Sequence, residues 1–242
     1  MAGWLLVWEM AATRRWISPL FFPAPTTILR TLLAYSASGK LVADLAATLG
    51  RLLMGLMLGG SMGMLLGLLM GGSPRLRRLV DPLVAAMHPI PKISLLPLVL
   101  IIFGLGESSR VVLVAVASFF PTVINTMTGV QQIPPIYYEV AANYQASPLT
   151  VFRRIIIPGS LPMILAGWRI ALNTALVITI AVELITAREG LGAAIWLAWQ
   201  TLRTEHFYAA LLVIAVLGLG SNGLLHLLSA WLIPWQRQDH ST

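Results

Sequence analysis

Long apolar stretches, separated by short polar ones, fill most of this chain. Apolar residues dominate five segments, at about residues 52–69, 80–103, 111–130, 161–185 and 208–233. A helix needs about 20 predominantly apolar residues to cross the hydrocarbon core of a bilayer. The pattern therefore predicts an all-α protein, a polytopic transmembrane helical bundle with five spans.

A shorter apolar segment lies at the N-terminus, over residues 1–12, and is interrupted by Glu9. It is too short to span a bilayer, and Arg14 and Arg15 follow it rather than precede it, unlike in a signal peptide. We interpret it as an interfacial helix or a truncated first span. A proline-rich break comes next, followed by a short helix that Thr26 or Thr27 can cap.

The first span carries glycines at a spacing of four residues, at Gly55, Gly59, Gly63 and Gly67. Residues four apart lie on one face of a helix, and small residues at this spacing let helix backbones approach closely in lipid. Glycine is also common in membrane helices generally. Three consecutive pairs on one face nevertheless favour a helix-packing surface.

The second span is broken by prolines and contains two basic side chains, His88 and Lys92. Interrupted backbone and cations at membrane depth are tolerated only where they face protein or water. Both residues are candidates for contact with an anionic solute in a pathway. The alternative is that both lie near the inner end of the span, with His88 as a neutral hydrogen-bonding group.

Two ionisable residues lie within the fourth span, Arg169 near its start and Glu183 toward its outer end. Such residues usually face a bundle interior or a cavity, so both are candidates for a pathway or gate. An anion pathway disfavours a carboxylate, which favours a structural or gating role for Glu183. Glu183 could pair with Arg188 if the helix extends that far, and Arg169 could face the pathway or a seam with a second copy.

Composition and charge narrow the possible functions. Of 242 residues, 10% are charged, against about 25% in soluble domains, which excludes a sizeable soluble catalytic domain. The net charge of +7 comes from basic clusters between apolar runs, where orientation in the bilayer explains them better than nucleic-acid binding. One cluster, Arg75 to Arg78, predicts a short cytoplasmic loop. The chain has no cysteine and no H-E-x-x-H motif, so we expect no metal site.

A polar stretch over residues 132–160 separates the third and fourth spans and predicts two short cytoplasmic helices. Glu139 is expected in the first turn of the first helix, where negative charge suits the helix dipole. Ser147 is expected to cap the second helix, with Pro148 in its first position. Arg153 and Arg154 lie within this second helix. Such a pair of helices is suited to receive a push from a soluble partner.

The pattern Glu139-x-Ala141-x(5)-Ser147, followed by Phe152, Ile155, Ile157, Pro158 and Pro162, resembles the EAA loop of ABC-type importer permeases. The chain is similar to the nitrate/sulfonate/taurine/bicarbonate branch of that family. The supporting motifs, in chain order, are Pro23-x-Pro25, Pro91-Lys92-Ile93-Ser94-Leu95-Leu96-Pro97-Leu98, Phe103-Gly104-Leu105-Gly106-Glu107, Phe119-Phe120-Pro121-Thr122, Asn125-Thr126, Glu183-Leu184-Ile185 and Gly190-Leu191-Gly192.

The resemblance implies a permease subunit of the bacterial inner membrane that pairs with a second copy and docks two cytoplasmic P-loop ATPases. An extracytoplasmic binding protein would deliver the solute. The chain lacks a G-x-x-x-x-G-K-[ST] loop, so it would be no enzyme and carry no cofactor, and the ATPase partner would bind ATP and Mg²⁺. The implied ATPase-coupling residues are Glu139, Ala141, Ala142, Gln145, Ser147, Phe152, Arg153, Arg154 and Pro158. The family has glycine where this chain has Gln145, at a left-handed position that costs another residue about 1 kcal/mol.

We treat residues 1–242 as a single permease domain, with an N-terminal partial span and amphipathic segment over 1–50, a helical core over 51–233 and the coupling loop over 132–160. The expected solute is a small anion such as nitrate, a sulfonate, taurine or bicarbonate, and the alternative within the family is a vitamin-like or pyrimidine compound. A stand-alone secondary transporter or channel is the alternative of another class. It would need intramembrane carboxylates, and Glu183 is the only acid well inside a span.

Overall fold

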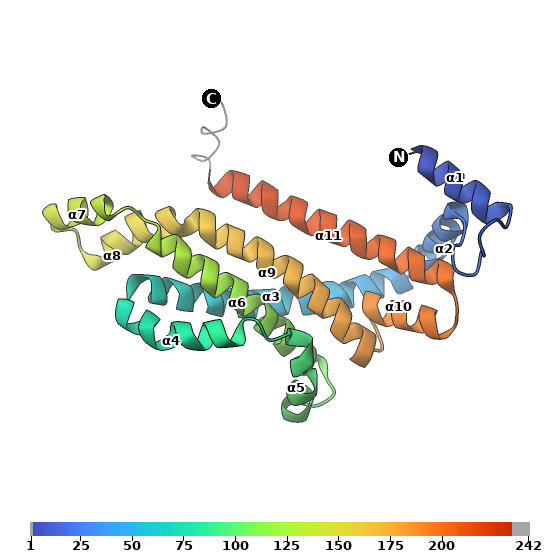
Figure 1. Ribbon diagram of the computed structural model, residues 1–242, viewed down its shortest axis with the longest axis horizontal. Coiled ribbons are helices and arrows are strands. Elements are labelled where there is room, and N and C mark those ends of the chain that lie inside the picture. Colours follow the sequence, from blue (N-terminus) through green and yellow to red (C-terminus); the bar gives the residue numbers. More distant parts are fainter. Residues whose placement is uncertain (1, 234–242) are drawn as a thin grey trace. The chain divides into compact units, whose positions relative to one another are not determined.

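The computed structural model describes residues 2–233, and all regular structure within them is helical (Figure 1). The chain forms two compact units, each assembled from separate segments. The first unit comprises residues 2–51 and 179–220, and the second comprises residues 52–178 and 221–233. Three long helices contribute to both units: α3 (Lys40–Gly72), α9 (Ile157–Thr186) and α11 (Thr204–Leu232).

Within the described residues, four helical segments are long and apolar enough to cross a bilayer: α3, α6 (Glu107–Gln131), Pro148–Thr186 and α11. Two further segments meet the same criterion only together, and they meet at an angle of 92°: α4 (Pro74–Met87) and Lys92–Phe103, the latter formed by the 3₁₀ helix η1 (Lys92–Leu95) and α5 (Leu96–Phe103). The all-α polytopic fold is confirmed. The segment predicted as the second span is a bent pair of helices, because Pro89 and Pro91 lie between the two parts and cannot donate helical hydrogen bonds.

The basic cluster near residue 75 is helical, so the loop predicted there is wrong. Ser73 has an extended backbone, and its hydroxyl accepts a hydrogen bond from the N–H of Leu76 at 3.4 Å. Pro74 occupies the first helical position. Serine followed by proline is a strong helix start, and α4 therefore begins directly before the arginines.

Two spans begin earlier than the apolar pattern predicts. α3 begins at Lys40, so the boundary expected between residues 50 and 51 falls inside a helix. α8 (Pro148–Val151), the π-helical turn η2 (Phe152–Ile156) and α9 follow one another without a break. The second of the two short helices predicted within residues 132–160 is therefore the first part of the long Pro148–Thr186 segment. The length of an apolar segment gives only the part of a helix that lies in lipid. Polar turns that extend the helix beyond the bilayer are not predicted from it.

α1 (Ala2–Thr13) and α2 (Pro25–Ala37) are joined by the carboxylate of Glu9. This carboxylate accepts the N–H of Thr26 at 3.0 Å and its hydroxyl at 2.7 Å. Glu9, 17 residues earlier in the chain, thus accepts hydrogen bonds from the first turn of α2. The predicted capping by Thr26 or Thr27 is wrong, because the N-cap residue is Ala24.

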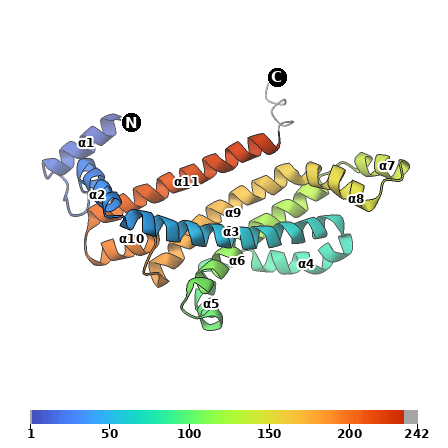
Figure 2. The same cartoon turned by 180° about the vertical axis from the view of Figure 1, so that it is seen from behind.

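In the second unit, α4 lies alongside the second half of α3 (Figures 1 and 2). A core of buried side chains joins these two helices to α6: Met70, Val84, Phe120 and Val123. A second buried cluster joins α3, α6 and α9: Leu68, Val130 and Ile164.

The glycine face of α3 lies directly against the backbone of α6. A Cβ added at Gly63 would lie 2.5 Å from the carbonyl oxygen of Phe119, and one at Gly67 would lie 2.7 Å from that of Val123. Gly55, Gly59 and Gly71 face α6 in the same way. This close approach needs residues without a side chain, as in other membrane helix pairs.

Candidate functional site

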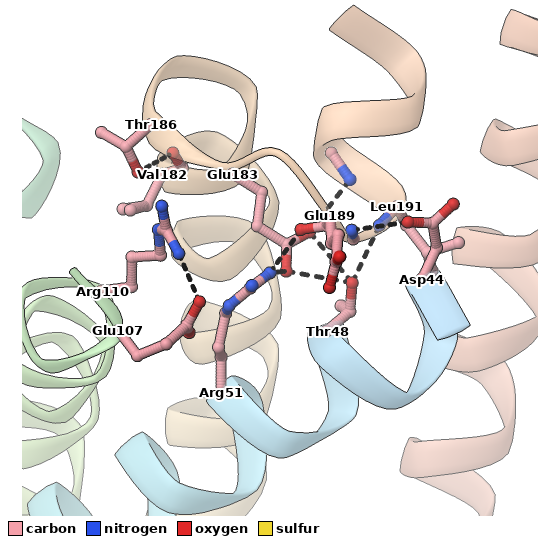
Figure 3. A network of polar contacts seen from close by, with 12 residues as sticks. Asp44, Thr48, Arg51, Glu107, Arg110, Val182, Glu183, Thr186, Glu189 and Leu191 are labelled. Carbon is pink, nitrogen blue, oxygen red and sulfur yellow. Dashed lines mark hydrogen bonds and ion pairs between the residues drawn. The ribbon is translucent and has the colours of Figure 1, made fainter. Parts of the chain in front are cut away.

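Buried polar side chains of the first unit surround the carboxylate of Glu183 in α9 (Figure 3). Glu183 is 0% exposed. Nη1 of Arg51 lies 2.6 Å from its Oε1, and the hydroxyl of Thr48 lies 3.0 and 2.9 Å from its two oxygens. The ion-pair partner of Glu183 is therefore Arg51 of α3. The pairing with Arg188 considered from the sequence is wrong, because α9 ends at Thr186, before Arg188.

The same network caps α10 (Leu191–Gln200). A helix N-terminus leaves its first amide groups without intrahelical partners. Three consecutive amides at the start of α10 donate to side chains of α3 and α9: Gly190 to Asp44 at 2.8 Å, Leu191 to Thr48 at 2.9 Å and Gly192 to Glu183 at 3.0 Å. Arg51 also donates to the carbonyl oxygen of Glu189 at 2.7 Å. Together these bonds hold the start of α10 between α3 and α9.

Gly190 is required by this turn for two reasons. Its φ is +120°, a region that residues with a side chain rarely adopt. A Cβ at this position would lie 2.6 Å from Cδ of Glu183 and 2.7 Å from Nη1 of Arg51. The Gly190-Leu191-Gly192 motif is thus explained by close packing against the ion pair.

Asp44 extends the network to α2. Its second oxygen accepts the hydroxyl of Tyr35 at 2.5 Å. Burial raises the pKa of the Tyr35 phenol, and the hydrogen bond and negative charge of Asp44 raise it further. Tyr35 therefore stays protonated and acts as a hydrogen-bond donor at physiological pH.

The sequence analysis did not identify the α3 members of this network. Asp44, Thr48 and Arg51 precede the apolar segment from which the span was predicted. Their spacing of four and then three residues places them on one helix face. This spacing is the signal in the sequence from which a shared polar site on α3 could have been predicted.

Lys92 stabilises the bend between α4 and η1. Its Nζ donates to three carbonyl oxygens, those of Met87 and His88 at 2.9 Å and that of Ile90 at 2.7 Å. A lysine ammonium has three donors, and a cation suits the C-terminal end of a helix. The ammonium also lies 4.4 Å from the ring centroid of Phe120, close enough for a cation–π interaction.

Replacing Lys92 by methionine is expected to weaken this bend, because the three carbonyls lose a shared donor. Water can reach these carbonyls in part, so the expected loss is about 1 kcal/mol. Thermal unfolding of the purified protein in nanodiscs measures it. Lys40→Met, at an exposed lysine outside the bend, is the control, with a smaller expected change. An equal stability of the two variants would contradict the capping role.

The four residues predicted for a pathway or gate lie in different surroundings. Lys92 is buried at the bend, and His88 is exposed there, with its ring centroid 6.1 Å from that of Phe120. Glu183 belongs to the buried network. Arg169 is exposed on α9.

The 132–160 segment presents a row of apolar side chains to its surroundings. α7 (Pro135–Asn143) and the turn after it expose four of them: Ile136, Tyr137, Val140 and Tyr144, of which Tyr144 is 83% exposed. Glu139 is exposed in the second turn of α7. The first-turn position predicted for it is wrong, because Pro135 already occupies the first helical position.

The turn between α7 and α8 follows the local signals in the sequence. Gln145 has a φ of +51°, so the left-handed position is confirmed. The N–H of Ala146 donates to the carbonyl oxygen of Ala141 at 2.9 Å, which closes the helix end. The predicted cap is also confirmed, since the Ser147 hydroxyl accepts the N–H of Thr150 at 3.3 Å and Pro148 occupies the first helical position.

The other residues implied for coupling have these positions: Ala142, Phe152, Arg153 and Arg154 are exposed, Pro158 is half-buried and Ala141 is buried. A groove of about 470 Å³ is lined by residues of α7 and of the Pro148–Thr186 segment, among them Tyr137, Arg154 and Pro158. The segment therefore offers apolar, cationic and anionic groups on its surface.

The geometry is that of a polytopic helical bundle in which α7 and its exposed apolar side chains lie between α6 and the Pro148–Thr186 segment. The chain belongs to the family described as binding-protein-dependent transport system inner membrane component, which matches residues 59–235. It is 35% identical over 240 residues to the taurine transport system permease protein TauC of Escherichia coli K12, covering 97% of this chain and 87% of that protein. It is 30% identical over 235 residues to the bicarbonate transport system permease protein CmpB of Synechocystis sp., covering 92% and 81%.

These matches confirm the predicted class and location. The chain is a permease component of a binding-protein-dependent ABC importer of the bacterial inner membrane. The matched family region already includes residues of both structural units, and the two relatives match nearly the whole chain.

Proposed function

We propose that two copies of this chain form the translocation pathway of an ATP-driven importer for a small oxyanion. Two cytoplasmic ATPase subunits dock on α7 and α8, and a soluble binding protein delivers the solute from outside. The row of exposed apolar side chains on α7 supports this proposal most directly. The names of the relatives, which refer to taurine and bicarbonate, support a small solute with a sulfonate or carboxylate-like group.

The surface of α7 suits a protein partner. Exposed apolar groups that form a contiguous patch usually mark a protein or membrane interface. α7 has only nine residues, which is too short to cross a bilayer. Exposed charges lie close in sequence to the apolar row, at Glu139, Arg153 and Arg154. An apolar row with a polar rim is typical of a protein–protein interface.

A stand-alone secondary transporter fits the site less well. Such a protein needs an ionisable group in the membrane that can exchange its coupling ion. Glu183 is instead held by Arg51, Thr48 and the amide of Gly192. The family match favours the importer independently, since the description of the family names a binding protein.

Affinity purification of the native chain from its own membranes, followed by mass spectrometry, tests the proposal. We expect a P-loop ATPase to co-purify in equal amount, and to fall at least tenfold when Val140 and Tyr144 are both replaced by aspartate. Leu105→Asp is the matched control, because Leu105 is 84% exposed in the turn before α6, whereas α7 follows the other end of that helix. This variant should retain the ATPase. Gel filtration checks that all variants are folded.

Two results would overturn the proposal. One is an ATPase content that the double replacement leaves unchanged. The other is a native chain that purifies alone and transports solute into proteoliposomes without ATP. Uptake of taurine, bicarbonate and a pyrimidine by the reconstituted importer then separates the solute classes.

A further inference from the structure

Four polar side chains form a strip on the surface of the second unit. α9 contributes Arg169 and Asn173, and α11 contributes Asn222 and His226. In each helix the two residues are four apart and share a face. Nδ2 of Asn222 donates to Oδ1 of Asn173 at 2.7 Å. This bond joins the two helices and places the two asparagines at the same depth.

The strip lies near the middle of two apolar spans. Asn173 is close to the midpoint of α9, and Asn222 lies in the central part of α11. The two helices run in opposite directions in this unit (Figures 1 and 2). Arg169 comes four residues before Asn173, and His226 comes four residues after Asn222. Both basic residues therefore lie on the same side of the asparagine pair, about 6 Å from it along the helix axes.

The strip differs from the surface that α3 exposes in the same unit. That surface is apolar and consists mainly of Met54, Met57, Leu58, Met62 and Leu65, as expected for contact with lipid. Arg169, Asn173 and His226 are exposed as well. An arginine facing lipid at this depth costs about 2.5–3.5 kcal/mol even on the insertion scale that gives the lowest values. The α9–α11 face is therefore covered by protein or by water.

We propose that this strip lines the aqueous translocation path and binds the solute near the membrane midplane. The proposal rests on the function proposed above and assigns the anion-binding groups to it. Within residues 2–233, neither Arg169 nor His226 makes a hydrogen bond or ion pair with another side chain, so their donors are available to a ligand. A guanidinium binds two oxygens of a sulfonate or carbonate group at once. The Asn222–Asn173 hydrogen bond holds the two helices together beside these cations.

Cysteine labelling tests the water-filled path without knowledge of the solute. The chain has no cysteine, so Asn173→Cys and His226→Cys each introduce a single thiol. Met57→Cys and Met62→Cys, on the exposed apolar face of α3, are the matched controls. In the complete importer in nanodiscs, a water-soluble methanethiosulfonate should react at least tenfold faster at positions 173 and 226 than at positions 57 and 62.

The anion preference is tested with two reagents of opposite charge. The ratio of the reaction rates with sulfonatoethyl and trimethylammonioethyl methanethiosulfonate at Cys-substituted position 173 should fall at least fivefold when Arg169→Gln is added. Arg169→Lys should keep most of the ratio. If Arg169 had only a structural role, its replacement would change the reaction rates of both reagents by the same factor and leave their ratio unchanged.

The results separate this proposal from the function on which it rests. Equally slow labelling at all four positions, or disulfide formation between two copies at position 173 without labelling, would overturn the water-filled path. An unchanged charge ratio in Arg169→Gln would overturn the anion site. The ATPase content of the same samples reports on the proposed function independently, because it depends on α7 and none of these variants alters α7.

Discussion

Replacing Arg51 by methionine is expected to remove most of the folded permease from the membrane, because Glu183 would be left buried without its cationic partner. Glu183 is fully buried, and Nη1 of Arg51 lies 2.6 Å from its carboxylate. Removing one partner of a buried ion pair costs about 3–5 kcal/mol, a large part of a typical stability of about 5–15 kcal/mol. The start of α10 also loses the bond from Arg51 to the carbonyl of Glu189.

Fluorescence-detected gel filtration of solubilised membranes measures the folded amount. Lys40→Met removes an exposed cation from the first turn of the same helix and is the matched control. The double variant Arg51→Met, Glu183→Met should recover part of the loss, since apolar replacement of both partners of a buried pair is often neutral. If Arg51→Met accumulated as well as Lys40→Met, the ion pair would not support the fold.

The apolar pattern predicts the four long apolar helices well, because the length of an apolar segment is a property of that segment alone. It misplaces helix ends where other forces set them. Lys40 begins α3 in a polar segment, and the Ser73-Pro74 pair begins α4 before a basic cluster. The prolines signal a bend between α4 and Lys92–Phe103, but its angle of 92° and the contact of Lys92 with Phe120 belong to the tertiary structure and have no local signal.

Local signals in the coupling segment are also readable from the sequence. Ser147 with Pro148 starts α8 as predicted, and Gln145 has the left-handed backbone that the family resemblance implies. Both features involve residues within a few positions of one another. Sequence reasoning can therefore find them without knowledge of the tertiary fold.

The ion-pair partner of a buried charge cannot be predicted from such local signals. Glu183 was recognised as an acid inside a span, but its partner, Arg51, lies 132 residues away. Several arginines were available to it by charge alone. Only the packing of α3 against α9 and α10 in the first unit decides which one reaches the carboxylate, and that packing also explains Gly190 and Gly192.

Gly59→Ala is expected to destabilise the permease although it adds a single methyl group. The added Cβ would overlap the carbonyl oxygen of Ala115 and lie 2.6 Å from its carbonyl carbon and 2.8 Å from its Cα. These are backbone atoms of α6, which cannot move aside as a flexible side chain can. Overpacking a tight contact typically costs about 1–3 kcal/mol, and separation of α3 from α6 would also loosen the contacts of Gly55 and Gly63.

The same substitution at Gly50 separates packing from helix propensity. Gly50 lies in the same helix, and a Cβ added there would meet open space. Alanine stabilises a helix relative to glycine by about 0.5–1 kcal/mol. Gly50→Ala should therefore unfold at the same or a higher temperature than the native protein in nanodiscs, while Gly59→Ala unfolds at a lower one. Equal shifts in the two variants would show that the four-residue glycine spacing is not the packing surface, since propensity acts on both positions and close approach acts on only one.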